Sequence, residues 1–273
     1  MHLSSPVTVF LAFLLTSLAM RSSAWETPLC PSGHAHNDYQ HERPLFEALD
    51  QGFLSVEADV WLVDGKLLVA HDRDEVQEGR TLESLYLEPL RKRVLMNKGH
   101  VHLGGAPFTL LIDFKSSAGP TYQALKSRLK FYDSILTKFE QGNIHQGPIT
   151  VVISGNRPIA EIQTESIRHV AIDGRINDLT NLPPKDLMPL ISDNWNKHFS
   201  WRGKGEMPAN EIEKLRNLIE QVHEHDRRLR LWSAPDLPAS WILQHQLGVD
   251  LINTDQLRSF AHYLDSLSST GPK

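Results

Sequence analysis

The sequence predicts a single α/β domain of the (β/α)8 barrel class, regular or distorted. Short β-branched or leucine-rich runs alternate with longer amphipathic segments, which is typical of parallel strands linked by helices. Eight strand-like runs occur, and the 273 residues suffice for a barrel, which needs about 250. Polar residues also stand near the carboxyl ends of these runs, where barrels of this class carry their active sites.

The expected strands are residues 29–35, 53–60, 66–71, 108–114, 149–154, 169–173, 229–233 and 249–253. Apolar residues at helical spacing predict helices at 44–51, 82–93, 121–139, 209–225 and 240–247. A ninth apolar run, 188–191, is expected to be an extra segment in the long insertion that precedes the 209–225 helix.

Composition excludes several classes of protein. The net charge is −5 and no basic stripe with interleaved aromatics occurs, so we expect no nucleic-acid partner. Cys30 is the only cysteine, which rules out an internal disulfide and a thiolate metal cluster. Nothing in the sequence indicates a protein partner.

The amino terminus resembles a secretory signal peptide. The apolar run 7–19 is too short to span a bilayer, which takes about 20 residues, and Ser22-Ser23-Ala24 resembles a cleavage site. We therefore expect a signal peptide at 1–24, a single domain at 25–273 and a secreted or periplasmic protein. No Lys or Arg precedes the run, so a retained membrane anchor is the alternative.

Three carboxylates predict a metal site. Glu57 and Asp59 are two residues apart in an apolar run, so in a strand both leave the same face. Two like charges side by side are costly unless a cation lies between them. Together with Asp113, they form an all-oxygen set that suits Mg²⁺ or Ca²⁺. The alternative is that Glu57 pairs with an arginine and Asp113 with Lys115.

Histidines near the carboxylates are candidates for general acid and base, since imidazole titrates near neutrality. His71 ends the run that follows the Asp64-Gly65 turn. His34 and His36 both stand at the end of the first expected strand, and the choice between them is open.

Other polar residues could contact a substrate. Asn37 follows His36, and Lys115 shares a strand face with Asp113, where it would place a positive charge beside the metal. Trp232 ends a late strand and would either wall a substrate pocket or cap the core.

The order His, Glu-x-Asp, Asp-Gly-(x)4-Ala-His-Asp and Asp-x-Lys resembles the phosphatidylinositol-phospholipase-C-like phosphodiesterase superfamily, which includes glycerophosphodiester phosphodiesterases and sphingomyelinase D. His-Ala-His-Asn-Asp-Tyr at 34–39 and Ser-Val-Glu-Ala-Asp-Val-Trp at 55–61 look most like the altered inheritance of mitochondria protein 6 homologs. The resemblance runs from about Cys30 to Asp255, where 248–255 looks like the last strand of the glycerophosphodiesterases.

The resemblance implies roles for individual residues. Matched to sphingomyelinase D, the second catalytic histidine beside His71 is His34; matched to the glycerophosphodiesterases, it is His36. The remaining implied roles are metal ligation by Glu57, Asp59 and Asp113, a lysine near the metal at Lys115 and a pocket aromatic at Trp232.

The resemblance therefore implies a metal-dependent phosphodiester hydrolase or lyase acting on a glycerophosphodiester or phospholipid headgroup, with at most transient contact with a membrane surface. The His-Arg-Gly and Pro-Glu-Asn-Thr signatures of glycerophosphodiesterases are absent, and one cysteine cannot form the bridged loop of spider sphingomyelinases. The substrate thus stays open, as does the choice between hydrolysis and cyclic-phosphate formation. The alternative function is a non-catalytic barrel that binds a phosphorylated ligand or partner.

Overall fold

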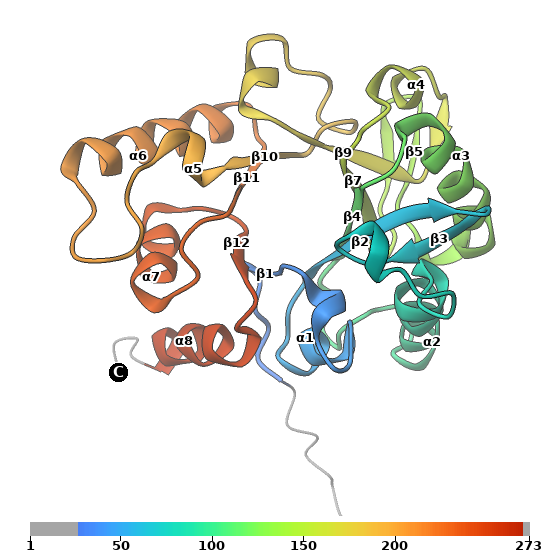
Figure 1. Cartoon of the computed structure of the whole chain (residues 1–273), viewed down its shortest axis with the longest axis horizontal. Helices are drawn as coiled ribbons and strands as arrows, with labels where there is room; N and C mark the ends of the chain where they lie inside the picture. The colour runs from blue at the N-terminus through green and yellow to red at the C-terminus, as the bar shows by residue number, and fades with distance from the viewer. Residues whose placement is uncertain (1–26, 270–273) are drawn as a thin grey trace, which may run out of the picture.

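A computed structural model describes residues 27–269 and shows a nearly closed barrel of eight parallel strands with helices outside it (Figure 1). The predicted signal peptide, 1–24, lies outside these residues. The strands follow one another around the barrel in the order β11-β10-β9-β7-β4-β2-β1-β12. Their bounds are Gly33–Ala35 (β1), Ser55–Val63 (β2), Phe108–Phe114 (β4), Ile149–Gly155 (β7), Val170–Gly174 (β9), Leu190–Asn194 (β10), Arg228–Trp232 (β11) and Ile252–Thr254 (β12).

The barrel closes between β11 and β12 through a short contact. A parallel bridge joins Arg230 to Leu251, and the backbone N–H of Leu251 donates to the carbonyl of Leu229 at 3.1 Å. The pairing of β1 with β2 is also short, with Ala35 opposite Val56, whereas β4 and β7 pair over a seven-residue register. The predicted fold class is confirmed.

The eight barrel strands are not the eight that we predicted. The run at 66–71 contains β3 (Lys66–Val69), which pairs antiparallel with β2 outside the barrel. Asp64 and Gly65 both have positive φ, and such a two-residue turn returns the chain beside the strand it came from. The run at 188–191, expected to be an extra segment, leads instead into barrel strand β10, which pairs with β9 and β11.

Helices surround the barrel (Figure 1). Their bounds are Phe46–Asp50 (α1), Glu88–Met96 (α2, after a π-helical turn at Glu83–Leu87), Ala118–Leu129 (α3), Ile159–Gln163 (α4), Trp195–His198 (α5), Ala209–Glu224 (α6), Pro238–Leu247 (α7) and Leu257–Ser269 (α8). Helix α8 was not predicted from the sequence. Within the described residues, no helix combines the length and apolar character needed to cross a membrane.

The helix predicted at 121–139 ends early. Helix α3 stops at Leu129, a 3-10 turn follows over Lys130–Ile135, and Lys138–Glu140 forms strand β5. Strand β5 pairs with β6 (Asn143–His145) and β8 (Ile167–Arg168) in a small second sheet. Helical spacing of apolar residues was therefore overridden by strand pairing.

The interior of the barrel changes from apolar to polar toward the carboxyl ends of the strands. Its apolar part is a small buried cluster that includes Leu111, Val152, Ala171, Leu190 and Leu251. Because side chains alternate along a strand, the inward position that follows each of these is two residues on. Those positions are polar on all five strands, and are Asp113, Ser154, Asp173, Ser192 and Asn253.

Candidate active site

Strand pairing brings the three predicted metal ligands together. Glu57 and Asp59 project from β2 and Asp113 from β4, and Asp59 lies opposite Asp113 in the parallel register. One carboxylate oxygen from each residue lies within 4.8 Å of the other two. Glu57 and Asp59 are buried and Asp113 is partly buried.

Two cations contact this cluster. Lys115 Nζ lies 3.0 Å from Asp59 Oδ2 and 3.1 Å from Asp113 Oδ1. Arg230 Nη2 lies 3.1 Å from Glu57 Oε2, and its side chain is buried. The ion pairs that we considered as the alternative to a metal site are thus both present, but two cations do not balance three carboxylates.

One oxygen of the cluster lacks a partner. Asp59 Oδ1 is buried and accepts no hydrogen bond from any described residue. An unpaired buried carboxylate oxygen is unfavourable. Such an oxygen is a ligand that hard divalent cations prefer. The residues present therefore fit a divalent ion, as the all-oxygen donor set predicts.

The carboxylates perturb one another. Burial, followed by the charge of Glu57, raises the pKa of Asp59 to about 6 despite Lys115. The same two causes raise the pKa of Asp113. Burial also acts to raise the pKa of Glu57, but Arg230 and His34 outweigh it and hold that pKa below its usual range. The site is thus short of positive charge at Asp59 and Asp113.

His71 follows β3 and contacts the cluster directly. Its Nδ1 lies 3.0 Å from Asp59 Oδ2, and the hydroxyl of Tyr39 lies 3.1 Å from the same nitrogen. The side chain is 49% exposed, so the ring also borders solvent. Because Nδ1 is engaged, Nε2 is the nitrogen available to a substrate. The β2–β3 hairpin is what carries this histidine back to the carboxylates.

His36 stands at the barrel mouth, just after β1. Its Nδ1 lies 2.9 Å from Asp255 Oδ1 and 2.9 Å from the side-chain nitrogen of Asn37. The side chain is 29% exposed. Burial alone would lower the pKa of His36, but the bond to Asp255 and the charge of Glu57 raise it above its ordinary value.

His34 lies two residues earlier on the same face and is completely buried. Its Nδ1 lies 2.7 Å from Ser55 Oγ and its Nε2 lies 3.1 Å from Glu57 Oε2. Burial, followed by the charge of Arg230, lowers the pKa of His34 to about 4. Both ring nitrogens therefore have protein partners, and the residue is placed to orient Glu57.

The two other predicted contact residues differ in position. Asn37 bridges His36 and Tyr39, whose hydroxyl lies 2.9 Å from Asn37 Oδ1. Trp232 ends β11 two residues after Arg230, so alternation places it on the inward face, above the arginine. Whether it walls a substrate pocket stays a prediction.

Sequence reasoning missed two residues of the site. The Tyr39 hydroxyl lies 2.7 Å from Asp59 Oδ2, and the Arg230 guanidinium contacts Glu57. Arg230 could have been found, because the alternation Arg-Leu-Arg-Leu-Trp at 228–232 puts it on the same face as Trp232. No spacing rule points to Tyr39, which lies in a turn.

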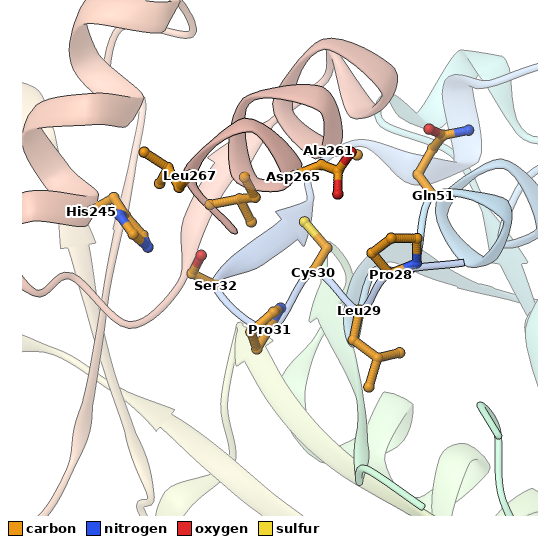
Figure 2. Close-up of a pocket in the computed structure, with 11 residues that line it drawn as sticks. Pro28, Leu29, Cys30, Pro31, Ser32, Gln51, His245, Ala261, Asp265 and Leu267 are labelled. Carbon is orange, nitrogen blue, oxygen red and sulfur yellow. The ribbon is translucent and has the colours of Figure 1, made fainter. Parts of the chain in front are cut away.

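A pocket of about 250 Å³ lies at the amino-terminal end of β1, away from the carboxylate cluster (Figure 2). Cys30, Ser32, His245 and Leu267 are among its lining residues, and none of the predicted site residues is. Burial raises the pKa of the Cys30 thiol to about 12, so it stays protonated. A protonated thiol is a poor nucleophile and a poor metal ligand.

Comparisons of the sequence with known proteins find one family. Residues 27–104 and 100–173 match the family model of the AIM6-like phosphodiesterase domain. The chain is 30% identical to altered inheritance of mitochondria protein 6 of Kluyveromyces lactis over 306 residues, which cover 87% of this chain and 73% of that protein. It is 31% identical to the protein of the same name from Eremothecium gossypii, over 87% of this chain and 70% of that one.

Solved structures share the fold. A glycerophosphodiester phosphodiesterase from Parabacteroides distasonis superposes with a TM-score of 0.51 at 16% identity, over 87% of this chain and 98% of that one. One from Agrobacterium tumefaciens superposes with a TM-score of 0.50 at 15% identity, over 86% of this chain and all of that one.

Proposed function

The chain belongs to the AIM6-like phosphodiesterase family and is a phosphoric diester hydrolase, and from this we propose that it works with a divalent metal and two histidines, His36 and His71. The observation that carries the proposal is geometric. The His71 side chain is 49% exposed and the His36 side chain 29%, and His71 contacts the carboxylate cluster directly. The non-catalytic alternative is set aside, because the family is one of phosphodiesterases.

Glu57, Asp59 and Asp113 would hold Mg²⁺ or Ca²⁺, and the unpartnered Oδ1 of Asp59 supports this assignment. When bound, such an ion neutralises negative charge on the phosphoryl oxygens. Lys115 contributes a second positive charge, and its contacts with Asp59 and Asp113 hold it in position.

The histidines supply the proton transfers. One imidazole removes a proton from the attacking water or hydroxyl, and the oxygen of that water or hydroxyl forms a bond to phosphorus. The bond from phosphorus to the leaving oxygen breaks, and the other imidazole protonates that oxygen. Asp59 holds His71 and Asp255 holds His36, each through Nδ1, so Nε2 would exchange the proton in both. His34 acts as a positioning residue for Glu57.

The substrate class that we propose is a glycerophosphodiester or phospholipid headgroup. The names of the two solved structures with the same fold support it. If a hydroxyl of the substrate is the nucleophile, the product is a cyclic phosphate; if water is, a phosphomonoester forms. Phosphorus NMR of the products distinguishes the two.

A turnover assay tests the proposal. Purified protein is incubated with Mg²⁺ or Ca²⁺ and a panel of phosphodiesters, beside Glu57→Gln, His71→Ala and a chelated sample. We expect turnover in the wild type and loss in the other three. Equal turnover in all four would remove the carboxylates, the histidine and the metal from the mechanism.

We also propose that the chain is exported and loses residues 1–24. The support is the apolar run 7–19 with small residues behind it. Amino-terminal sequencing of protein recovered from the medium or periplasm should start at residue 25, whereas an intact leader would contradict cleavage.

A further inference from the structure

A second, larger cavity opens beside the carboxylate cluster. Its volume is about 900 Å³, and it is lined by Trp61, Leu62, Arg73, Lys115, Ser116, Ser117, Ala118, Gly155, Asn156 and Arg157. These residues come from the ends of β2 and β7 and from the segments that follow β3, β4 and β7.

The cavity is continuous with the site. Lys115 lines it and contacts both Asp59 and Asp113. Gly155 lines it too, and lies so near Asp113 that a Cβ at this position would be 2.5 Å from Asp113 Oδ1. A phosphodiester bound at the carboxylates would therefore have room to extend one of its two alcohol portions into this space.

Positive charge gathers around the cavity. Arg73, Lys115 and Arg157 line it, and none of the residues assigned to its wall in the described part of the chain is acidic. Lys115 is paired with Asp59 and Asp113, so the positive charge that can meet a ligand in the cavity comes mainly from the two arginines. A surrounding of this kind attracts anions.

Arg157 is held in place before any ligand arrives. Its Nη1 donates to the carbonyl of Asp173 at 2.5 Å and lies 3.6 Å from Asp178 Oδ2. Its side chain is only 15% exposed. The contacts seen among the described residues use Nη1, which leaves the rest of the guanidinium fork to a ligand. Little side-chain freedom remains to be lost on binding.

Arg73 also lines the cavity and lies two residues after His71 in the sequence. Its guanidinium is 5.9 Å from the centre of the Trp61 ring, a cation–π contact. The Trp61 indole donates to the carbonyl of His71 at 3.3 Å, so the same ring links the cavity to the histidine. Arg73 is exposed and can adjust to the group it meets.

The wall suits a hydrophilic group better than an acyl chain. Only Trp61, Leu62 and Ala118 contribute apolar side chains, whereas Ser116, Ser117, Asn156 and the three cations are polar. An aliphatic chain bound here would remove water from the charged groups and offer them no hydrogen bond in exchange, which is unfavourable.

We propose that this cavity selects a phosphodiester whose polar alcohol portion carries a second phosphate, which Arg73 and Arg157 bind while the diester lies at the carboxylates. The inference rests on the proposed function, and it narrows the substrate from glycerophosphodiesters and phospholipid headgroups in general to those whose headgroup carries a second phosphate. Guanidinium groups bind phosphate through paired, charge-assisted hydrogen bonds, which gives the recognition its strength.

The test compares two substrates that differ by one phosphate, glycerophosphoinositol and glycerophosphoinositol 4-phosphate. We expect the wild type to hydrolyse the phosphorylated ester with the higher kcat/KM. In Arg157→Gln the ratio of the two kcat/KM values should fall about tenfold, the worth of one charge-assisted hydrogen bond. Arg73→Gln should lower it less, because this residue is exposed.

Arg216→Gln is the matched control, since Arg216 is an exposed arginine on α6 that does not line the cavity. It should leave both substrates unaffected. A wild type without preference, or an Arg157→Gln protein that loses activity on both substrates equally, would overturn the proposal. The ratio is the informative readout, because a folding defect moves both values together.

Failure of the proposed function looks different. A wild type that hydrolyses neither ester with Mg²⁺ or Ca²⁺ contradicts the catalytic proposal, and calorimetric titration with the same two esters then decides on the cavity. Tighter binding of the phosphorylated ester, lost in Arg157→Gln, supports the phosphate subsite. Equal binding of both esters, or none, overturns it.

Discussion

Two polar clusters lie inside the same barrel, and they differ in how far the protein itself satisfies their carboxylates. The first is the three carboxylates on β2 and β4, and the second is Asp173 on β9 with the side chains of Ser154, Ser192 and Arg175 around it. In the first, Lys115 and Arg230 face three carboxylates, and Asp59 Oδ1 has no partner among the described residues. The charges of that cluster do not balance without a further cation.

In the second cluster, Asp173 is fully engaged. Its Oδ2 accepts from the Ser154 hydroxyl at 2.8 Å and from Arg175 Nη1 at 2.9 Å, and its Oδ1 accepts from the Ser192 hydroxyl at 2.5 Å. The carboxylate has hydrogen bonds on both oxygens and an arginine as counter-ion, so nothing further is required there.

The difference separates a ligand site from a structural network. Both clusters stand at carboxyl ends of barrel strands, so position alone does not distinguish them. What distinguishes them is a combination found only in the first cluster, an unpartnered buried oxygen together with three carboxylates that face two cations. The first cluster is therefore assigned to function and the second to stability.

The largest difference between the clusters is expected in activity. His71→Ala should lower kcat by about 10²–10⁴-fold, the usual contribution of a general acid or base, with little change in melting temperature because the ring is half exposed. Steady-state kinetics and thermal unfolding measure the two effects. His262→Ala, an exposed histidine on α8, is the control. Wild-type kcat in His71→Ala would assign the site to another role.

The next largest effect is a difference between His36 and His34, one expected to act in catalysis and the other in stability. His36→Ala should lower kcat as strongly as His71→Ala and leave stability nearly unchanged. His34→Ala should lower the free energy of unfolding by about 1–3 kcal/mol, because Ser55 and Glu57 lose a buried partner. Denaturant unfolding and kinetics on both variants test this. The reverse pattern would make His34 the catalytic residue.

Neutralising one carboxylate in each cluster should have opposite results. Asp173→Asn should lower the free energy of unfolding by about 2 kcal/mol, because Arg175 loses its counter-ion. Asp59→Asn should leave the metal-free protein as stable or more so, because it relieves repulsion.

Metal binding sharpens the same comparison. At 100 times its dissociation constant, Mg²⁺ or Ca²⁺ should add about 2.7 kcal/mol to the wild type and to Asp173→Asn, but not to Asp59→Asn. Calorimetric melting with and without the ion measures the gain. An equal gain in Asp59→Asn would show that the ion binds elsewhere.

The smallest effect is a pH dependence of the first cluster. Burial and Glu57 raise the pKa of Asp59 from 3.8 to about 6, so between these values the folded protein binds more protons than the unfolded chain. Stability of the metal-free protein should therefore fall as pH rises from about 4 to about 6, by on the order of 2 kcal/mol. Urea unfolding across this range tests it. Asp59→Asn should reduce the slope but not abolish it, because burial also raises the pKa of Asp38 to about 6. A slope that is unchanged in Asp59→Asn would contradict the assignment.

The barrel itself was predictable because its strands are apolar runs of the right length and number. The sequence did not predict that β3 lies outside the barrel and that β10 takes a place within it. Both runs have strand composition, and only pairing separates them: the turn at Asp64–Gly65 returns β3 antiparallel to β2, while β10 finds two parallel neighbours. The composition of a run indicates that it forms a strand. It does not indicate which strand will pair with it.

Part of the acidic site was likewise predictable from the sequence, and part depended on the tertiary structure. The period of two along a strand suffices to place Glu57 with Asp59, and Asp113 with Lys115, on common faces, so their chemistry could be inferred from the sequence. Their meeting across β2 and β4, the approach of Arg230 from β11 and the burial of His34 below His36 required the closed barrel. These contacts join residues up to about 170 positions apart, and local periodicity carries no information over such separations.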